Sequence, residues 1–453
     1  MNLNKNIFRE YDIRGVYGDE LTDELAYHIG RAFGTKLIRQ NIRSTVVAYD
    51  NRLSSVNLES NLVRGLVDTG VIVKRIGLAT TPMCYFAANF LGSNSSMMIT
   101  ASHNPKEYNG FKFSYNGIHN AYGASVMEIH DLIEKQDYEN GVGRIENIDI
   151  REDYINLVIG KLNFGRRIKV IYDCGNGTGS IIAGDIFKRL EDKVDYIPLF
   201  DISDGNFPNH HPDPCVEENL EVLKQKVIEN HADVGIGYDG DADRVGFVSE
   251  KGTFIEIDKF LAIMWDYLYD KVDKKECLYD VKCSKTLEDE LNKLGVKGFE
   301  YRTGNSYTRA ESARGDYPLS GELSGHVYFR DKWPGYDDGI YVGMRLIEMI
   351  SNSDKPLSSY LENLEKYYST PEIKVKVTDE TKFEIVNKMK EYCESKNYNF
   401  ITIDGVKVKF DDGFALVRAS NTGPNITMRF EAKTIEKLNI YQNEFETELK
   451  KYL

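Results

Sequence analysis

Apolar runs of strand length alternate with segments of helical periodicity through most of the 453-residue chain. This alternation is typical of α/β layering, in which helices cover the faces of a sheet. Three of the apolar runs end in Tyr-Asp and lead into a polar or Gly-containing loop, and they are residues 46–50, 170–173 and 277–280. The intervals between them are the size of a domain. The pattern predicts three related α/β units, with chance similarity of such short runs as the alternative.

The C-terminal segment has a different pattern. A strand, a helix, several short strands and a final amphipathic helix follow one another, which is typical of a small α+β domain. We therefore predict an α/β protein of four domains, three of them similar mixed α/β domains and the fourth a small C-terminal α+β domain. The expected domain boundaries are 1–147, 148–250, 251–368 and 369–453.

Composition limits the class of protein. The chain is 41% hydrophobic and 28% charged, as is ordinary for a soluble globular protein, and its net charge is −14. An acidic chain repels phosphate backbones, so we expect no nucleic-acid partner, and a small anionic ligand needs a local basic pocket. Six cysteines without a C-x-x-C pair favour reduced thiols. The N-terminus is not signal-like and no apolar run approaches 18 residues, so a cytoplasmic protein without a membrane partner is expected.

The first candidate for chemistry is a serine at the end of a predicted strand. The motif TASHNP, residues 100–105, follows the apolar residues 97–99. Ser102 in such a loop is exposed and orientable, and a serine acts as a nucleophile or carries a phosphoryl group when a base or metal activates it. A Ser/Asn turn that caps the next element is the alternative interpretation.

The second candidate is an acidic loop, DGDADR at residues 239–244, between two apolar runs. The carboxylates at alternating positions, Asp239, Asp241 and Asp243, can converge on one hard cation, and without a cation their repulsion raises their pKa values. A calcium loop fails at its sixth position, where Arg244 replaces the required Gly. A solvated acidic turn is the remaining alternative, and we predict Mg²⁺ with positions open for a phosphate.

Two further loops carry side chains suited to a sugar phosphate. RASNTGP, residues 418–424, offers Arg418 as a bidentate donor together with hydroxyl groups and a Gly-Pro turn, and an ordinary polar turn is the alternative. GELSGH, residues 321–326, offers polar groups and His326, which can act as acid or base near neutrality, and a surface turn is the alternative. The loop DGNFPNHHPDP, residues 204–214, has two histidines but no third ligand at suitable spacing, so we expect no metal there.

Taken in order along the chain, these motifs resemble those of the α-D-phosphohexomutase superfamily. The similarity extends nearly end to end and includes FREYDIRG (8–15), TASHNP, GFK (110–112), DGNFPNHHPDP, DGDADR, DVKC (280–283), GELSGH and RASNTGP. FREYDIRG and RASNT are most similar to the phosphomannomutase/phosphoglucomutase branch. The resemblance implies three similar α/β domains and a smaller fourth domain around a central cleft.

The resemblance also implies a set of site residues. Ser102 would be the phosphoserine and would complete the Mg²⁺ ligands Asp239, Asp241 and Asp243. The other catalytic residues would be His103, Lys112, Arg244 and His326. The substrate-binding residues would be Tyr11, Arg14, Lys282, Asn305, Glu322, Leu323, Ser324, Gly325, His326, Arg418, Ala419, Ser420, Asn421, Thr422 and Arg429.

Two positions depart from the superfamily pattern. Asn305 stands where related enzymes carry His, and because Asn cannot transfer protons, acid/base chemistry falls more on His326. Gly423 stands where many members have Glu, which weakens the support of the phosphate-binding loop without removing its donors.

The expected activity is that of a phosphohexomutase, which interconverts hexose 1-phosphate and hexose 6-phosphate, with mannose preferred and glucose also accepted. The resemblance implies sugar phosphates as partners and a hexose 1,6-bisphosphate as intermediate and activator. Phosphoglucosamine mutase and metal-dependent sugar-phosphate phosphohydrolase are the alternative enzymes. A silent sugar-phosphate-binding protein is the non-enzymatic alternative, and the presence of Ser102, the three Asp and Arg418 argues against it. Monomer and dimer are both open.

Overall fold

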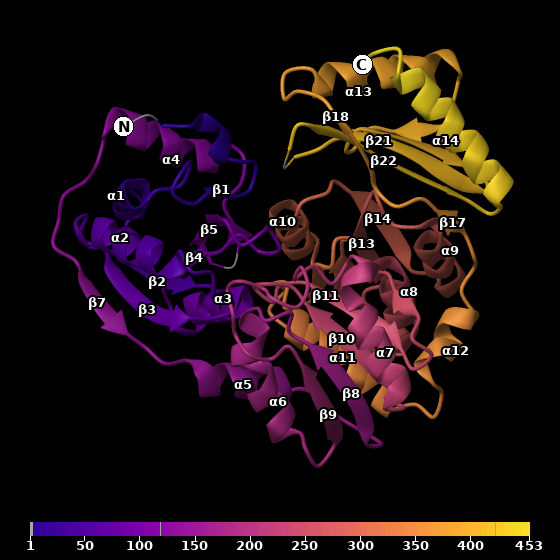
Figure 1. Cartoon of the computed structure of the whole chain (residues 1–453), viewed down its shortest axis with the longest axis horizontal. Coiled ribbons are helices and arrows are strands. Elements are labelled where there is room, and N and C mark those ends of the chain that lie inside the picture. Colours follow the sequence, from indigo (N-terminus) through magenta and orange to yellow (C-terminus); the bar gives the residue numbers. More distant parts are fainter. Residues whose placement is uncertain (1–2, 118, 422) are drawn as a thin grey trace. The chain divides into compact units, whose positions relative to one another are not determined.

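The computed structural model describes residues 3–117, 119–421 and 423–453 (Figure 1). The chain forms two compact units. The first unit consists of Met1–Ile255 and Ser324–Ser359, and the second of Glu256–Leu323 and Tyr360–Leu453. The chain therefore leaves the first unit and returns to it, and one of these passages falls inside the GELSGH loop.

The first sheet of the first unit is organised around β2, which pairs in parallel with β3 and β4, while β4 pairs antiparallel with β5. The order is β1-β5-β4-β2-β3-β7, and β6 pairs with β5. Helix α1 begins after Thr22, whose Oγ1 accepts a hydrogen bond from the Leu25 N–H. The elements are β1 (Ile13–Val16), α1 (Asp23–Arg39), β2 (Ser44–Tyr49), α2 (Ser55–Val67), β3 (Ile72–Leu78), α3 (Thr81–Phe90), β4 (Ser96–Ile99), β5 (Tyr108–Asn116), β6 (His119–Asn120), α4 (Ala124–Lys135) and β7 (Arg144–Asn147).

The second sheet of the first unit repeats this arrangement around β8. Strand β8 pairs in parallel with β9 and β10, and β10 pairs antiparallel with β11 in the order β12-β11-β10-β8-β9. Helix α11 returns from later in the chain and packs against β8, β10 and β11. The elements are α5 (Arg151–Ile159), β8 (Ile168–Asp173), α6 (Ala183–Arg189), β9 (Val194–Leu199), α7 (Glu221–Glu229), β10 (Val234–Tyr238), β11 (Val245–Ser249), β12 (Phe254–Ile255) and α11 (Gly339–Ser351). The unit also contains β16 (Val327–Phe329), which is not a strand of this sheet.

The second unit contains a third such arrangement around β13, which pairs in parallel with β14 and β15. The strands β2, β8 and β13 are the ones that carry the three Tyr-Asp runs, so each run occupies the strand between two parallel neighbours. The prediction of three similar α/β units is confirmed. The elements are α8 (Ile257–Leu268), β13 (Glu276–Asp280), α9 (Lys285–Leu294), β14 (Lys297–Tyr301), α10 (Asn305–Gly315) and β15 (Leu319–Gly321).

The C-terminal part of the second unit is an antiparallel sheet of order β17-β22-β21-β20-β19, with β18 paired to β22. Helices α13 and α14 cover one face of it (Figure 1), where Met389 and Phe445 pack on Val417 and Met428. Alternation places Arg418 on the opposite face. The elements are β17 (Tyr368–Ser369), β18 (Ile373–Lys376), α13 (Lys382–Ser395), β19 (Phe400–Ile401), β20 (Val406–Phe410), β21 (Gly413–Ala419), β22 (Asn425–Ala432) and α14 (Ile435–Leu449).

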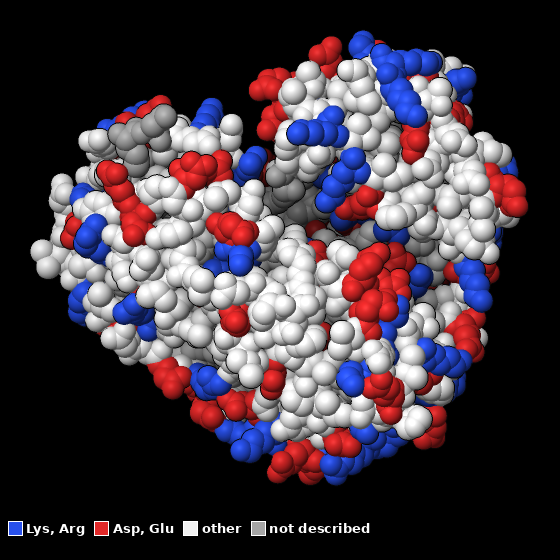
Figure 2. All heavy atoms as spheres, viewed as in Figure 1, with Lys and Arg blue, Asp and Glu red and all other residues white. Residues whose placement is uncertain are grey.

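The remaining elements are the short helix α12 (Leu357–Glu362) and the 3-10 turns η1 (Lys5–Ile7), η2 (Thr178–Ile181), η3 (Glu217–Leu220) and η4 (Tyr269–Lys271). All six cysteines are free thiols, as expected. Within the described ranges, the helices lack the length and apolar character needed to cross a bilayer. Basic and acidic side chains are interspersed over most of the face shown in Figure 2.

Candidate active site

Ser102 lies in the loop after β4, but the expectation that it is exposed is wrong. Only 1% of its surface is exposed, because the acidic loop packs against it. Its backbone has a φ of 51°, a left-handed conformation that a serine seldom adopts. The Ser102 N–H donates to Thr100 Oγ1 over 2.9 Å. A strained and pinned backbone of this kind is common where a side chain must be aimed at one point.

Arg52 holds this serine loop in place. The buried guanidinium donates to the carbonyl oxygens of Ser102 and Asn104 over 2.8 and 2.6 Å, and it also reaches those of Pro105 and Tyr108. Asp50, the last residue of the first Tyr-Asp run, lies 3.1 Å from Arg52 Nε. Sequence reasoning missed Arg52, although its position directly after that run was a usable signal.

The acidic loop lies between β10 and β11 and meets Ser102 directly. The Ser102 Oγ donates to Asp239 Oδ2 over 2.9 Å. The loops approach so closely that a Cβ on Gly240 would lie 2.6 Å from the Ser102 carbonyl oxygen. A glycine at this point is therefore required for the contact between Ser102 and Asp239.

Lys112 on β5 faces the other two carboxylates of the loop. Its Nζ lies 2.8 Å from Asp241 Oδ2 and 2.6 Å from Asp243 Oδ2. Burial alone would lower the pKa of Lys112, but the two carboxylates hold it well above its usual value. Burial and the charges of Asp241 and Asp243 raise the pKa of Asp239 well above its usual value, whereas Lys112 lowers that of Asp241 against the effect of burial.

The three carboxylates have the properties of a cation site. Oxygen atoms of Asp239, Asp241 and Asp243 lie within 4.8 Å of one another, and all three residues are buried. The Oδ1 atoms of Asp241 and Asp243 have no hydrogen-bond partner among the described residues. Such buried, unpaired carboxylate oxygens fit a hard divalent cation. Strand β11 follows Arg244 immediately, which excludes a calcium loop of the helix-loop-helix type.

His326 lies between Arg244 and a carboxylate that the sequence did not indicate. Arg244 Nε donates to His326 Nε2 over 3.1 Å, and His326 Nδ1 lies 2.7 Å from Asp337 Oδ2. Because Arg244 can only donate, Nε2 of the neutral ring is the acceptor and Nδ1 carries the proton. Nδ1 and Asp337 Oδ2 do not form a hydrogen bond with each other, so Asp337 acts on His326 through its negative charge.

The residues near the N-terminus reach the same loop. Arg14 on β1 donates to Asn104 Oδ1 over 2.8 Å, and Tyr11 is half-buried just before this strand. His103 Nδ1 lies 3.3 Å from Ser102 Oγ. Burial, followed by the charges of Arg244 and Arg14, lowers the pKa of His103 well below its usual value, so His103 is neutral near pH 7.

A second group of cationic residues lies in the second unit. Lys282 Nζ lies 3.1 Å from Glu372 Oε1 and 3.7 Å from Asp280 Oδ2. Lys282, together with the charges of Arg418 and Arg429, lowers the pKa of Glu372 to about 2. Lys282, Arg418 and Arg429 thus gather around one carboxylate, although they come from segments far apart in the sequence. Sequence reasoning missed Glu372.

The phosphate-binding motif is braced by another residue that sequence reasoning missed. Arg418 Nε donates to Asp404 Oδ2 over 3.0 Å, and the same oxygen accepts from the Thr303 N–H over 3.0 Å. Asn421 Nδ2 donates to the Thr303 carbonyl oxygen over 3.4 Å. The Ser420 carbonyl oxygen accepts from Lys382 Nζ over 2.8 Å.

The remaining positions of this motif are Ala419, Thr422 and Gly423. Ala419 ends β21, and Thr422 lies outside the described residues. The Gly423 carbonyl oxygen accepts from Lys382 Nζ over 3.4 Å, so this lysine supports the loop where Glu is absent.

The GELSGH loop contributes to both units. In the second unit, the buried Glu322 accepts from the Gly304 N–H over 3.2 Å, next to Asn305 at the start of α10, and the Leu323 N–H donates to Asp280 Oδ1 over 3.4 Å. Ser324, Gly325 and His326 belong to the first unit. There the Gly325 carbonyl oxygen accepts from the Val245 N–H over 3.2 Å.

The two histidines of the loop at residues 204–214 do not form a metal site among the described residues. His210 Nε2 instead lies 3.1 Å from both carboxylate oxygens of Asp173. Asp173 ends the second Tyr-Asp run, so His210 helps to position the loop that follows β8.

Repeated α/β units, a buried serine beside a carboxylate triad and a separate cluster of lysine and arginine define a phosphotransferase for phosphorylated small molecules. Comparison with known proteins gives the family. The profiles of phosphoglucomutase/phosphomannomutase alpha/beta/alpha domains I, II and III match residues 5–140, 152–252 and 256–368, and the profile of the C-terminal domain matches residues 372–448. The chain belongs to the phosphoglucomutase/phosphomannomutase family, and its predicted four-domain composition is confirmed.

Individual relatives agree with this result. The phosphomannomutase/phosphoglucomutase of Pseudomonas aeruginosa is 40% identical over 448 residues, which are 99% of this chain and 96% of that protein. A phosphoglucomutase/phosphomannomutase family protein from Burkholderia thailandensis has a similar structure, with a TM-score of 0.92, 36% identity and coverage of 99% and 98% of the two chains. An Aspergillus fumigatus N-acetylphosphoglucosamine mutase, solved with GlcNAc-6P and magnesium, shares the fold, with a TM-score of 0.63, 13% identity and coverage of 96% and 94%.

Proposed function

We propose that this protein interconverts hexose 1-phosphate and hexose 6-phosphate, with mannose preferred and glucose also accepted. The observation that carries the proposal is the hydrogen bond of 2.9 Å from the buried Ser102 Oγ to Asp239. It brings a serine that can carry a phosphoryl group against a set of carboxylates that fits a divalent cation. The identity of 40% over nearly the whole chain to a phosphomannomutase/phosphoglucomutase supports this choice of reaction.

In the proposed reaction, phosphorylated Ser102 donates its phosphoryl group to the free hydroxyl of the substrate. The product of this step is a hexose 1,6-bisphosphate, and the substrate hydroxyl loses its proton. The bisphosphate then turns around, and its other phosphoryl group returns to Ser102. Added hexose 1,6-bisphosphate phosphorylates resting enzyme and therefore acts as an activator.

His326 is the group that we assign to the proton. Its Nε2 is the acceptor nitrogen of the ring, and Asp337 at Nδ1 stabilises the imidazolium that forms when Nε2 takes the hydroxyl proton. Arg244 and Lys112 stabilise charge on the transferring phosphoryl group, and the neutral His103 lies beside Ser102. Asn305 cannot transfer a proton, so we assign it a role in binding the substrate.

The metal proposal is Mg²⁺ held by Asp239, Asp241, Asp243 and the phosphoryl group on Ser102. When bound, such an ion neutralises the charge of the phosphoryl oxygens. In the absence of the ion, Lys112 stabilises two of the carboxylates. This contact keeps the acidic loop folded while Ser102 is unphosphorylated.

The substrate-binding proposal comprises two groups. The phosphate that does not react is bound by Arg418, the 419–422 loop and Arg429, close to Lys282. The sugar is bound by residues 322–326 with Tyr11, Arg14 and Asn305. We also propose that the boundaries of the four domains are 1–147, 148–250, 251–368 and 369–453.

Coupled assays with purified protein on mannose, glucose and glucosamine 1-phosphates test the function. Formation of mannose 6-phosphate, and more slowly of glucose 6-phosphate, is expected. Turnover of glucosamine 1-phosphate alone would identify a phosphoglucosamine mutase. Stoichiometric release of inorganic phosphate without any 6-phosphate would identify a phosphohydrolase and overturn the proposal.

A further inference from the structure

Thr81, the first residue of helix α3, is not one of the proposed site residues, but it contacts a proposed metal ligand. Its Oγ1 donates to Asp241 Oδ2 over 2.6 Å, and its N–H donates to the Asp241 carbonyl oxygen over 3.0 Å. Both residues are fully buried. The preceding Thr80 caps the helix, since its Oγ1 accepts from the Met83 N–H over 3.2 Å. The Thr81 hydroxyl is therefore available to hold Asp241.

The hydrogen bonds to Asp241 are distributed unevenly between its two carboxylate oxygens. Besides the Thr81 hydroxyl, Oδ2 accepts from Lys112 Nζ over 2.8 Å and from Thr100 Oγ1 over 3.2 Å. Oδ1 is buried and has no hydrogen-bond partner in the part of the chain that the structure describes. One oxygen is thus fixed by three donors, while the other is left for a cation.

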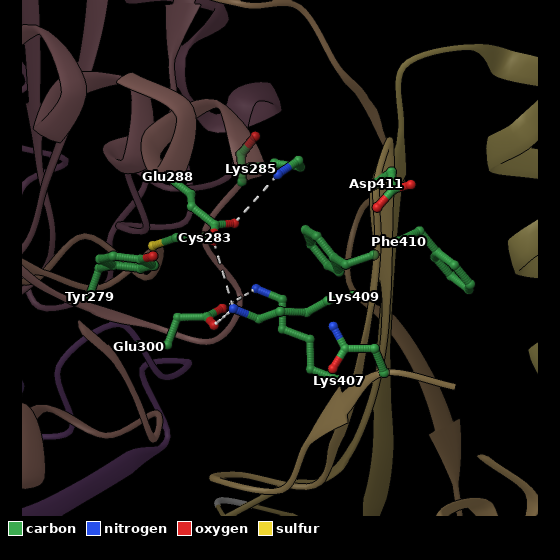
Figure 3. Close-up of a pocket in the computed structure, with 13 residues that line it drawn as sticks. Tyr279, Cys283, Lys285, Glu288, Glu300, Lys407, Lys409, Phe410 and Asp411 are labelled. Carbon is green, nitrogen blue, oxygen red and sulfur yellow. Dashed lines mark hydrogen bonds and ion pairs between the residues drawn. The ribbon is translucent and has the colours of Figure 1, made fainter. Parts of the chain in front are cut away.

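A carboxylate of the second unit shows a different distribution. Glu300 pairs with Lys407 through Oε1 and with Lys409 through Oε2, so each of its oxygens has an ammonium group of its own (Figure 3). Buried polar atoms normally have such a partner. The contrast shows that Asp241 is not simply neutralised by its neighbours, since all of its side-chain donors are on one oxygen.

We propose that Thr81 is a positioning residue that restricts Asp241 to binding the metal through one oxygen, and that it thereby favours Mg²⁺ over Ca²⁺. The inference rests on the proposed Mg²⁺ site. Mg²⁺ is small and requires a regular octahedral arrangement, whereas the larger Ca²⁺ takes more ligands and often binds both oxygens of a carboxylate. Without the Thr81 hydroxyl, the Asp241 carboxylate is free to turn both oxygens toward the ion.

Binding of Mn²⁺ to the purified full chain tests this role without an activity measurement. Electron paramagnetic resonance measures free Mn²⁺, which has the same preference for carboxylate oxygen as Mg²⁺, and its displacement by Mg²⁺ or Ca²⁺ gives the Kd of each ion. All proteins are compared at the same degree of Ser102 phosphorylation, checked by intact mass. In Thr81→Ala the Kd for Mg²⁺ should rise roughly 10–100-fold, as is typical when a partner of a metal ligand is lost. The Kd for Ca²⁺ should rise much less.

Three further variants serve as controls. Thr81→Ser keeps the hydroxyl and should bind both ions as the wild type does. Thr81→Val, whose added methyl group is too close to Asp241 Oδ2 for the present contact, should weaken Mg²⁺ binding at least as much as Thr81→Ala. Thr45→Ala is the matched control, because Thr45 is equally buried on β2 and its Oγ1 lies 2.8 Å from Ser95 Oγ. It should leave both Kd values unchanged.

The outcomes separate this inference from the metal proposal on which it rests. Equal weakening of Mg²⁺ and Ca²⁺ binding in Thr81→Ala, or weakening that Thr81→Ser shares, would indicate a general structural effect and overturn the role of Thr81. Unchanged Kd values in Thr81→Ala would overturn it as well. Wild-type protein that binds neither Mn²⁺ nor Mg²⁺ would instead overturn the proposed metal site, and this inference with it.

Discussion

His326 Nδ1 lies 2.7 Å from Asp337 Oδ2, while Arg244 donates to the other nitrogen of the same ring. Arg244 therefore makes Nε2 the accepting nitrogen, and Asp337 places a negative charge beside Nδ1. In Asp337→Asn this charge is lost, so the imidazolium that forms on proton transfer is less stable. We expect kcat to fall roughly 10²-fold, the size of a general acid–base contribution, with a displaced basic limb of the pH–rate profile.

The matched control for that variant is Asp338→Asn. Asp338 is equally buried, but its carboxylate accepts from the Tyr154 hydroxyl and the Tyr341 N–H rather than facing His326. Its turnover should stay close to wild type. Equal losses in the two variants, with unchanged pH profiles, would mean that Asp337 has only a structural role.

Ser102→Ala tests the phosphoryl carrier. The variant removes the hydroxyl that donates to Asp239, and turnover should fall on the order of 10³-fold or more. Intact-mass measurement should show a phosphorylated fraction in the wild type that the variant lacks. Near-wild-type turnover by Ser102→Ala would exclude the phosphoserine mechanism.

Removal of divalent cations tests the carboxylate triad. EDTA should abolish turnover, and Mg²⁺ should restore it, because the Oδ1 atoms of Asp241 and Asp243 have no hydrogen-bond partner in the part of the chain that the structure describes. Asp241→Asn should lower activity even at saturating Mg²⁺, while Asp192→Asn, at an exposed position, should have no effect. Full activity in chelator would rule out the metal, and rescue by Ca²⁺ alone would identify a different ion.

Arg418→Ala tests the binding of the non-reacting phosphate. Each charge-assisted contact contributes about 1.5–3 kcal/mol, so kcat/KM should fall roughly 10–100-fold. The loss should appear in both directions of the reaction, because one clamp binds either phosphate of the turning bisphosphate. Arg39→Ala, which removes an exposed arginine paired to Asp137 and Glu139, is the control. A loss in one direction only would argue against a shared clamp.

The pKa of the buried Asp338 leads to a prediction about stability. Burial raises the pKa of Asp338 to about 7, despite hydrogen bonds from Tyr341 and Tyr154. The folded protein therefore keeps this proton at pH values where the unfolded chain has released it, so the contribution of Asp338 to stability is full below about pH 4 and is lost as the pH rises to 7. Between these values the free energy of unfolding of the wild type should fall relative to that of Asp338→Asn by up to about 1.4 kcal/mol per pH unit. Urea denaturation of both proteins at pH 5 and pH 7 measures the difference, and parallel changes would contradict it.

The serine and metal loops could be predicted from the sequence because each is a contiguous motif at the end of a strand. Ser102 follows one apolar run, and Asp239, Asp241 and Asp243 follow another at alternating positions. Local spacing alone places each group at the end of its own strand, whereas β4 and β10 belong to different sheets, so the contact between the two loops depends on the tertiary structure. The three Tyr-Asp runs likewise predicted three equivalent central strands, since strand pattern is a local property.

The tertiary structure decided which partners hold these groups. Arg52 and Asp337 occur in no candidate motif, and Glu372 and Asp404 lie in loops of ordinary composition. Each acquires its role because folding places its charge against a residue distant in the chain, as Glu372 is placed against Lys282. The sequence by itself thus determined the local motifs and the class of fold. The long-range pairs that orient, protonate or brace those motifs depend on strand order and packing, because neither produces a periodic pattern in the sequence.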